Sequence, residues 1–233
     1  TINSKIRKIM NLFTKSTYVG FTATPYANVL IDPEGTDEDV GDDLFPAEFI
    51  SCISTPSNYI GPKDIFDPEG EYYDTMLRNN EDMDKVLPIK HKNGTTLDHI
   101  PDSLIDALDC YILTCAIRDL EGQGKEPMSM MIHSSRFKST HESLLRVVEE
   151  EYYRIRGDIT NYSSLPIEKA MLNRTIKHIH DTWVREYSSF ENGKYVWSEI
   201  LRQLDNSLEK VRVFKINSES DDSLDYYNHP DLR

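Results

Sequence analysis

The chain has 233 residues and a mass of 27.0 kDa, with 38% hydrophobic and 28% charged residues. Its formal net charge of −14 weighs against binding nucleic acid through bulk electrostatics, because such binding depends on clustered Lys and Arg. No stretch reaches the roughly 18 apolar residues that span a bilayer, and three cysteines form no paired framework, so we expect a cytoplasmic protein without membrane association.

One helix, two strands and much irregular chain are predicted for the first hundred residues. Residues 2–13 place isoleucine and leucine side chains at helical spacing, which predicts an amphipathic helix. The apolar stretches "STYVGF" (16–21) and "FISCIST" (49–55) each predict a strand, whereas the acidic run 32–43 predicts a solvated loop. Residues 56–100 mix Pro, Gly, Asn and acidic residues with isolated aromatics, which indicates an irregular linker or an insertion.

The chain changes character at Pro101, where long helical patterns begin. The order of the elements is typical of an α/β protein, and the long interval between the last two strands indicates an inserted helical subdomain. The predicted elements are a helix over 101–122, a buried strand "MSMMIH" (128–133), a helix after "SSRFKST" that stops at Gly157, helices over 166–187 and 197–208, and a strand "VRVFKINS" (211–218).

The usual catalytic signatures are missing from the chain. There is no G-x-x-x-x-G-K-[ST] phosphate loop, no G-x-G-x-x-G and no H-E-x-x-H motif. No Lys follows an Asp or Glu at a distance of two, so the carboxylate–lysine pair of restriction-type nucleases is absent. His178 and His180 lie two apart on a predicted helix and therefore point about 200° apart, which prevents them from chelating one ion. No metal site is predicted.

Two places in the sequence could carry a function. The first is "FTATP", where a predicted strand ends in Thr22, Ala23, Thr24 and Pro25 at the sheet edge where α/β proteins bind ligands. The second is the run His133, Ser134, Ser135 and Arg136, where a buried strand leads into a helix. Hydroxyls, a guanidinium and free backbone N–H groups at a helix start suit a phosphate. The alternative is purely structural, with a turn at Pro25, a serine cap and a surface ion pair of Arg136.

Several blocks of sequence resemble one known family. "GFTATP" resembles motif III of superfamily-two helicases and restriction-enzyme motor subunits. A wider set resembles the Z1 domain, found in a family named for endonucleases: bacterial and phage proteins with a helicase-like motor, often encoded beside methyltransferases in restriction or defence loci. The matching blocks are "IN-x-x-IR" (2–7), "YVGFTATPYANVLIDP" (18–33), "DLFPAEFI" (43–50), "NYIG" (58–61), "CAIRDLEGQ" (115–123), "MMIHSSRF" (130–137) and "INSES" (216–220).

The resemblance implies a fold and a domain organisation. The fold class would be α/β, with incomplete RecA-like P-loop NTPase lobes and a mostly helical insertion. Residues 1–34 would form the end of lobe one with motif III, and residues 35–100 a connecting, family-specific segment. Residues 101–233 would start lobe two, with the helical insertion at about 138–210.

The resemblance also implies a function. The chain would be part of an ATP-dependent DNA motor, helicase- or translocase-like, in a bacterial restriction or phage-defence system. Thr22, Ala23, Thr24 and Pro25 would couple nucleotide state to DNA movement, and His133, Ser134, Ser135 and Arg136 would lie near nucleotide or DNA backbone. A longer parent protein would use ATP and Mg²⁺, whereas this chain alone is expected to bind neither, to hydrolyse no ATP and to carry no catalytic residue. The expected partners are DNA and methyltransferase or other defence-operon proteins.

Two other functions remain open at this point. One is a metal-dependent DNA endonuclease that uses scattered carboxylates such as Asp64, Glu69 and Glu71. Those residues lie in an irregular segment, and metal-assisted hydrolysis requires preorganised ligands. The other is a partner-docking module built from the helical residues 138–210, which the acidic composition mildly favours.

Overall fold

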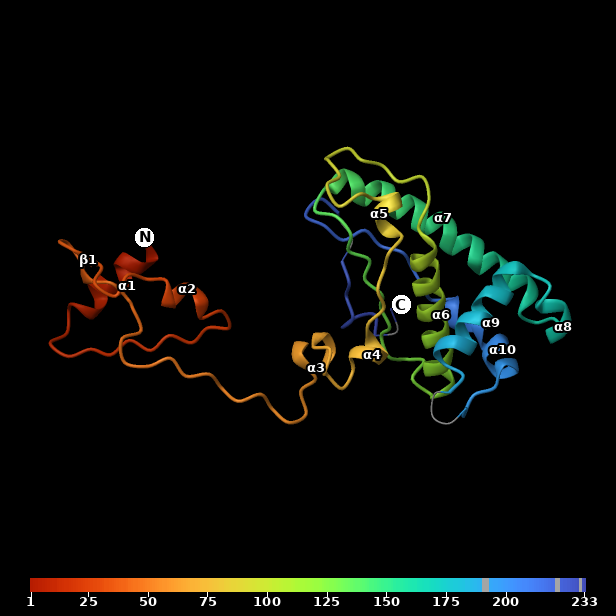
Figure 1. Cartoon of the computed structure of the whole chain (residues 1–233), viewed down its shortest axis with the longest axis horizontal. Helices are drawn as coiled ribbons and strands as arrows, with labels where there is room; N and C mark the ends of the chain where they lie inside the picture. The colour runs from red at the N-terminus through yellow and green to blue at the C-terminus, as the bar shows by residue number, and fades with distance from the viewer. Residues whose placement is uncertain (190–192, 221–222, 231) are drawn as a thin grey trace. The chain divides into compact units, whose positions relative to one another are not determined.

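Helices dominate the computed structural model, which describes residues 1–189, 193–220, 223–230 and 232–233 (Figure 1). Helices hold 44% of the chain and strands 2%, and the described residues contain no RecA-like α/β lobe. The predicted fold class is therefore wrong. The chain divides into two compact units, Thr1–Leu77 and Arg78–Arg233, whereas the predicted boundaries at 34 and 100 remain predictions.

The predicted strands are absent from the described chain. Residues 16–21 and 49–55 run as irregular chain with nothing to bury them, since Phe21 is 93% exposed and Ile53 92% exposed. A two-stranded antiparallel sheet instead lies within the acidic run that was predicted to be a loop. Its strands are β1 (Thr36–Asp37) and β2 (Gly41–Asp42).

The first unit is built around α1 (Ile2–Met10), which is capped by the Thr1 side chain. Polar side chains of this helix and its end hold the β1–β2 hairpin: Asn3 Nδ2 donates to Asp43 Oδ1 at 2.8 Å, and Asn11 Nδ2 donates to the Val40 carbonyl at 3.1 Å. Arg7 donates to the carbonyl of Gly41. The other helices of this unit are α2 (Tyr26–Val29), α3 (Pro62–Phe66) and α4 (Tyr73–Met76).

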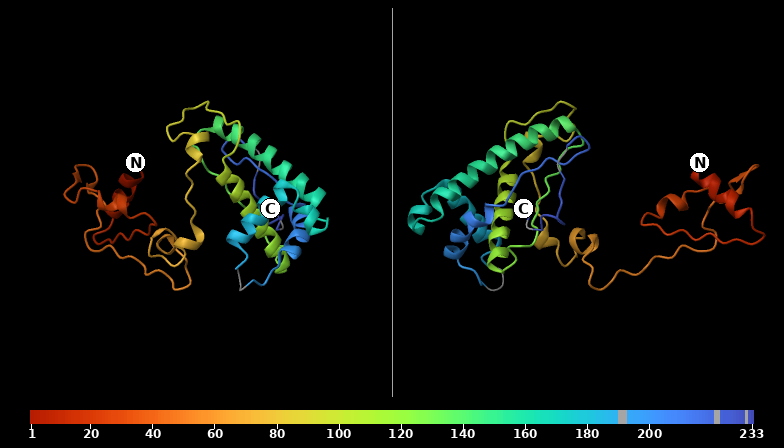
Figure 2. Two further views of the ribbon diagram at one scale, coloured as in Figure 1. Left: turned by 45° about the vertical axis from the view of Figure 1, so that its right-hand side comes forward. Right: turned by 180° about the vertical axis from the view of Figure 1, so that it is seen from behind.

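The second unit contains the hydrophobic core, with α6 (Asp102–Leu120) at its centre. This helix packs against α9 (Arg174–Glu186) and α10 (Trp197–Leu208), as both views of Figure 2 show, and α7 (Lys138–Tyr162) packs on α9 and α10. Ile112, Leu113 and Ala116 of α6 are almost fully buried. Two short helices complete the unit, α5 (Met83–Val86) and α8 (Ile167–Ala170). None of the described helices is long and apolar enough to cross a membrane.

The helix ends follow local chemistry. Gly122 has a φ of 80°, and the N–H groups of Gly122 and Gln123 bond back to the carbonyls of Asp119 and Arg118, which closes α6 in a Schellman motif. Gly157 does not stop α7, because the helix continues to Tyr162. The single helix predicted over 166–187 is two helices, α8 and α9, and the second begins where the Asn173 side chain caps Ile176 N.

The apolar stretches 128–133 and 211–216 lie on the core as extended chain, although neither is a strand. Side chains alternate between packed and exposed positions along both, as in a half-buried strand, so the prediction of a fully buried segment at 128–133 is wrong. Met128 N donates to the Leu232 carbonyl and Arg212 N to the Arg233 carbonyl. The stretches thus share the segment 232–233 as a neighbour but do not form a ladder.

Candidate functional site

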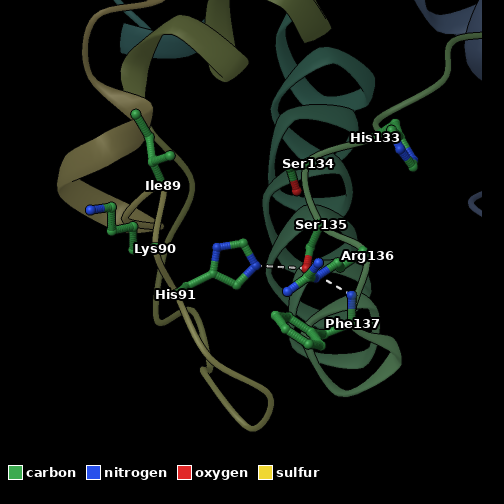
Figure 3. Close-up of a pocket in the computed structure, with 8 residues that line it drawn as sticks. All are labelled: Ile89, Lys90, His91, His133, Ser134, Ser135, Arg136 and Phe137. Atoms are coloured by element: carbon green, nitrogen blue, oxygen red, sulfur yellow. Dashed lines mark hydrogen bonds between the residues drawn. The ribbon is translucent and has the colours of Figure 1, made fainter.

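A cavity of about 660 Å³ lies where the loop of residues 89–91 faces residues 133–137 (Figure 3). It contains all four residues of the predicted run from His133 to Arg136. It also includes a loop from the stretch 56–100, which was predicted to be an irregular linker or an insertion. The lining residues are Ile89, Lys90, His91, His133, Ser134, Ser135, Arg136 and Phe137.

Ser135 is the best-connected residue of this cavity. Its Oγ lies 2.8 Å from His91 Nε2 and accepts a hydrogen bond of 3.0 Å from Phe137 N. On the other side of the ring, His91 Nδ1 lies 2.9 Å from the Pro88 carbonyl. Since a carbonyl can only accept, Nδ1 carries the proton of the neutral ring, and Nε2 is left to accept from the Ser135 hydroxyl.

The loop that carries His91 is fastened to one side of α7 by side-chain hydrogen bonds. Gly94 N donates to Ser139 Oγ at 2.9 Å, Thr140 Oγ1 donates to the Thr95 carbonyl at 3.2 Å, and Ser143 bonds the backbone of Leu97. Ser143 lies four residues after Ser139 and three after Thr140 on the helix, so it shares a face with each of them. Arg146 extends this line to the Leu97 carbonyl at 2.8 Å.

Arg136 supplies positive charge beside this hydroxyl. Its guanidinium lies 4.9 Å from the centre of the Phe137 ring, and the His91 ring meets the same ring edge-on at 5.5 Å. α7 begins at Lys138, immediately after Phe137. The first N–H groups of a helix lack intrahelical partners and carry partial positive charge. A guanidinium, a hydroxyl and a helix start suit an anion such as a phosphate.

The other residues of the predicted run have different positions. Ser134 Oγ is buried and has no hydrogen-bond partner among the described residues. The His133 ring points away from His91 and Ser135, and so does the Lys90 side chain (Figure 3). His141 Nε2 donates to the Ser135 carbonyl at 2.8 Å and so fixes the backbone of the run.

The second predicted site, Thr22 to Pro25, belongs to the other unit. Thr22, Ala23 and Thr24 are exposed, and the hydroxyl of Thr22 accepts a hydrogen bond of 3.0 Å from Thr24 N. Pro25 is the N-cap residue of α2. These contacts form a local turn, and the coupling role of the four residues remains a prediction.

No motif in the sequence predicts His91, the partner of Ser135. The two residues lie 44 positions apart, and no local motif connects them. The only signal available was chemical, because His91 is the one histidine of the irregular stretch "LPIKHKNGTT" (87–96).

A separate polar cluster joins α6 to α9. His178 Nδ1 lies 2.7 Å from Oδ2 of the buried Asp109, and its Nε2 lies 3.5 Å from Asp106 Oδ1. Burial raises the pKa of Asp109 to about 6, although the hydrogen bond with His178 acts in the opposite direction. His180 instead stacks edge-on against Trp197 at 4.9 Å. The two histidines thus have separate partners.

In the part of the chain that the structure describes, no group of three or more His, Cys, Asp or Glu side chains could hold a metal ion. Of the carboxylates considered for a nuclease, Asp64 accepts a hydrogen bond of 2.8 Å from Gly61 N and so caps α3. Glu69 follows in the turn at Asp67, whose side chain accepts from Glu69 N at 3.0 Å.

Comparison with known families gives one result. A family model described as the Z1 domain matches residues 103–233, more than half of the chain. The chain belongs to the Z1 domain family. Neither the curated proteins nor the solved structures gave a match to it. The Z1 match includes Ser134, Ser135 and Arg136, whereas His91 and the stretch from Thr22 to Pro25 precede it.

Proposed function

We propose that this Z1 domain chain is part of an ATP-dependent motor that acts on DNA in a bacterial restriction or phage-defence system. Its Ser134, Ser135 and Arg136 contact phosphate of nucleotide or of the DNA backbone. Membership of the Z1 family and the motor-like "GFTATP" block support this proposal.

The observation that carries the proposal is the cavity in front of α7. It combines the Arg136 guanidinium and the Ser135 hydroxyl with Phe137, the N-cap residue of the 25-residue helix α7. Hydrogen bonds between charged groups and phosphate are about twice as strong as neutral ones. A local anion site of this kind is compatible with a net charge of −14, because it depends on a few oriented groups and not on the summed charge.

The proposed motor uses ATP and Mg²⁺, which the natural full-length protein binds. Its proposed partners are DNA and the methyltransferase or other products of the same defence operon. In this scheme Thr22 and Thr24 sense the state of the nucleotide, and the cavity in front of α7 contacts phosphate.

DNA-stimulated ATP hydrolysis by the natural full-length protein tests the proposal. We expect Arg136→Gln to lower the stimulated rate by about ten- to hundredfold, as expected for the loss of one charge-assisted contact. Arg202→Gln, which changes an exposed arginine of α10 away from the cavity, serves as the matched control and should keep the rate. A full-length protein without ATP hydrolysis in the presence of DNA would contradict the proposal.

A further inference from the structure

The Ser135–His91 pair has the arrangement of a nucleophile, a base and a group that orients the base. Ser135 Oγ lies 2.8 Å from His91 Nε2, and His91 Nδ1 lies 2.9 Å from the Pro88 carbonyl. We propose that Ser135 is a catalytic nucleophile and His91 its general base, in the cleavage of phosphate esters through a covalent seryl phosphate. This activity goes beyond the proposed motor function, which requires only that the cavity binds phosphate.

A hydrogen bond to the Pro88 carbonyl fixes the orientation of the His91 ring. The Pro88 carbonyl selects the tautomer with the proton on Nδ1, so the lone pair of Nε2 points at the serine hydroxyl. A serine hydroxyl is a weak nucleophile until a neighbouring base accepts its proton. The Pro88 carbonyl thus orients the His91 ring, as the aspartate carboxylate orients the histidine of a serine–histidine–aspartate triad.

The second hydrogen bond of Ser135 is compatible with this role. Phe137 N donates to Ser135 Oγ at 3.0 Å, which occupies one of the two lone pairs of the oxygen. The other lone pair remains for attack. As the proton leaves Ser135, negative charge develops on Oγ, and an N–H group already pointed at that atom stabilises it.

The chemical class of the substrate follows from the surroundings. The Arg136 guanidinium and the start of α7 favour an anion beside the serine. A phosphate mono- or diester supplies both the negative charge and an electrophilic phosphorus. The cavity of about 660 Å³ is open enough to admit such a group.

The proposed reaction has two balanced steps. In the first, the Ser135 hydroxyl proton moves to His91 Nε2, the Oγ–P bond forms, and the ester P–O bond breaks. The leaving alkoxide takes the proton from His91. In the second step, water attacks the phosphorus while His91 accepts a proton from the water. The Oγ–P bond breaks, and that proton returns to Ser135.

Covalent labelling with a fluorophosphonate probe tests the nucleophile directly, because activated serines form an Oγ–P bond with loss of fluoride. We expect mass spectrometry of the digested chain to place the label on Ser135. His91→Gln keeps a polar side chain but cannot accept the proton, so it should slow labelling at least about tenfold, the low end for loss of a general base. Ser188→Ala changes a serine that donates to the Val184 carbonyl, and it should label like the wild type.

Two further measurements complete the test. Thermal unfolding of His91→Gln must show a folded protein, and His91→Ala replaces it if it does not. The wild type should hydrolyse bis(4-nitrophenyl) phosphate, and the folded His91 variant should do so at least about tenfold more slowly. Labelling that avoids Ser135, or that proceeds equally without the His91 imidazole, overturns the proposal. DNA-stimulated ATP hydrolysis is measured separately, so it can succeed or fail independently.

Discussion

His91 and Ser135 are joined by a 2.8 Å contact between Nε2 and Oγ although 44 residues separate them. The contact exists because the intervening chain returns along α7, whose hydroxyl side chains bind the backbone of residues 94–97. The geometry of the cavity therefore depends on polar side chains of one helix face, and each of these can be removed singly.

Ser143 is a buried anchor that bonds both backbone groups of one residue. Its Oγ accepts from Leu97 N and donates to the Leu97 carbonyl. Ser143→Ala leaves a buried N–H without its partner, which we expect to cost about 1–3 kcal/mol of unfolding free energy. Urea denaturation measures this cost. The exposed Ser139→Ala is the matched control and should cost less than half as much, and equal losses in both variants would contradict the account.

Breaking the ion pair of Asp119 and Arg233 should lower the free energy of unfolding more than Ser143→Ala does. Both side chains are nearly buried, at 8% and 3% exposure, and Ser207 Oγ also donates to Asp119 at 2.5 Å. Asp119→Ala leaves a buried guanidinium without its counter-charge, which is expected to cost about 3–5 kcal/mol. Chemical denaturation gives the value. A loss below 1 kcal/mol would show that the pair is solvated in solution.

Asp109 predicts a pH dependence of defined sign. Burial raises its pKa from 3.8 to about 6, so the folded state holds this proton more tightly than the unfolded state. The stabilisation is present below pH ~4 and is lost as the pH rises through ~6. Asp109→Asn removes this titration, so the variant should gain about 2–3 kcal/mol on the wild type between pH 4 and pH 7.

The difference between variant and wild type is the quantity to measure, because His178, Asp106 and Glu151 also act on Asp109 and are present in both proteins. Asn can still accept the hydrogen bond from His178 Nδ1. A flat difference for Asp109→Asn would contradict the assigned pKa.

How far the sequence predicts this fold depends on the kind of element. Helical periodicity located α6, α7 and α10 because each has an apolar face that the others cover. Strand patterns failed because a strand requires a ladder of backbone hydrogen bonds. Residues 128–133 and 211–216 alternate between packed and exposed side chains, yet the bonds of Met128 N and Arg212 N to the segment 232–233 do not form a ladder. Of the two segments that line the cavity, the sequence points to only one. Ser134 to Arg136 lie on one continuous segment, whereas His91 joins them only through the tertiary fold.

Alanine substitutions at two glycines should change the stability of the chain in opposite directions. Gly122 has a φ of 80°, a backbone conformation that costs an L-residue about 1 kcal/mol, so Gly122→Ala should destabilise the chain by that amount. Gly157 lies inside α7, and a Cβ added there would point into open space. Gly157→Ala should therefore stabilise the chain by about 0.5–1 kcal/mol. Thermal unfolding of the two variants measures both changes in stability. Changes of the same sign would contradict the helix boundaries.

Phosphate binding by the cavity is the central claim, and fluorescence anisotropy with a labelled single-stranded oligonucleotide tests it most directly. We predict binding that weakens with added salt, because each neutralised phosphate releases counterions. Arg136→Gln should weaken binding by about tenfold or more, whereas Arg202→Gln should change it less than about twofold. Equal affinities of the two variants, or no binding even at low salt, would contradict the assignment of this cavity as a phosphate site.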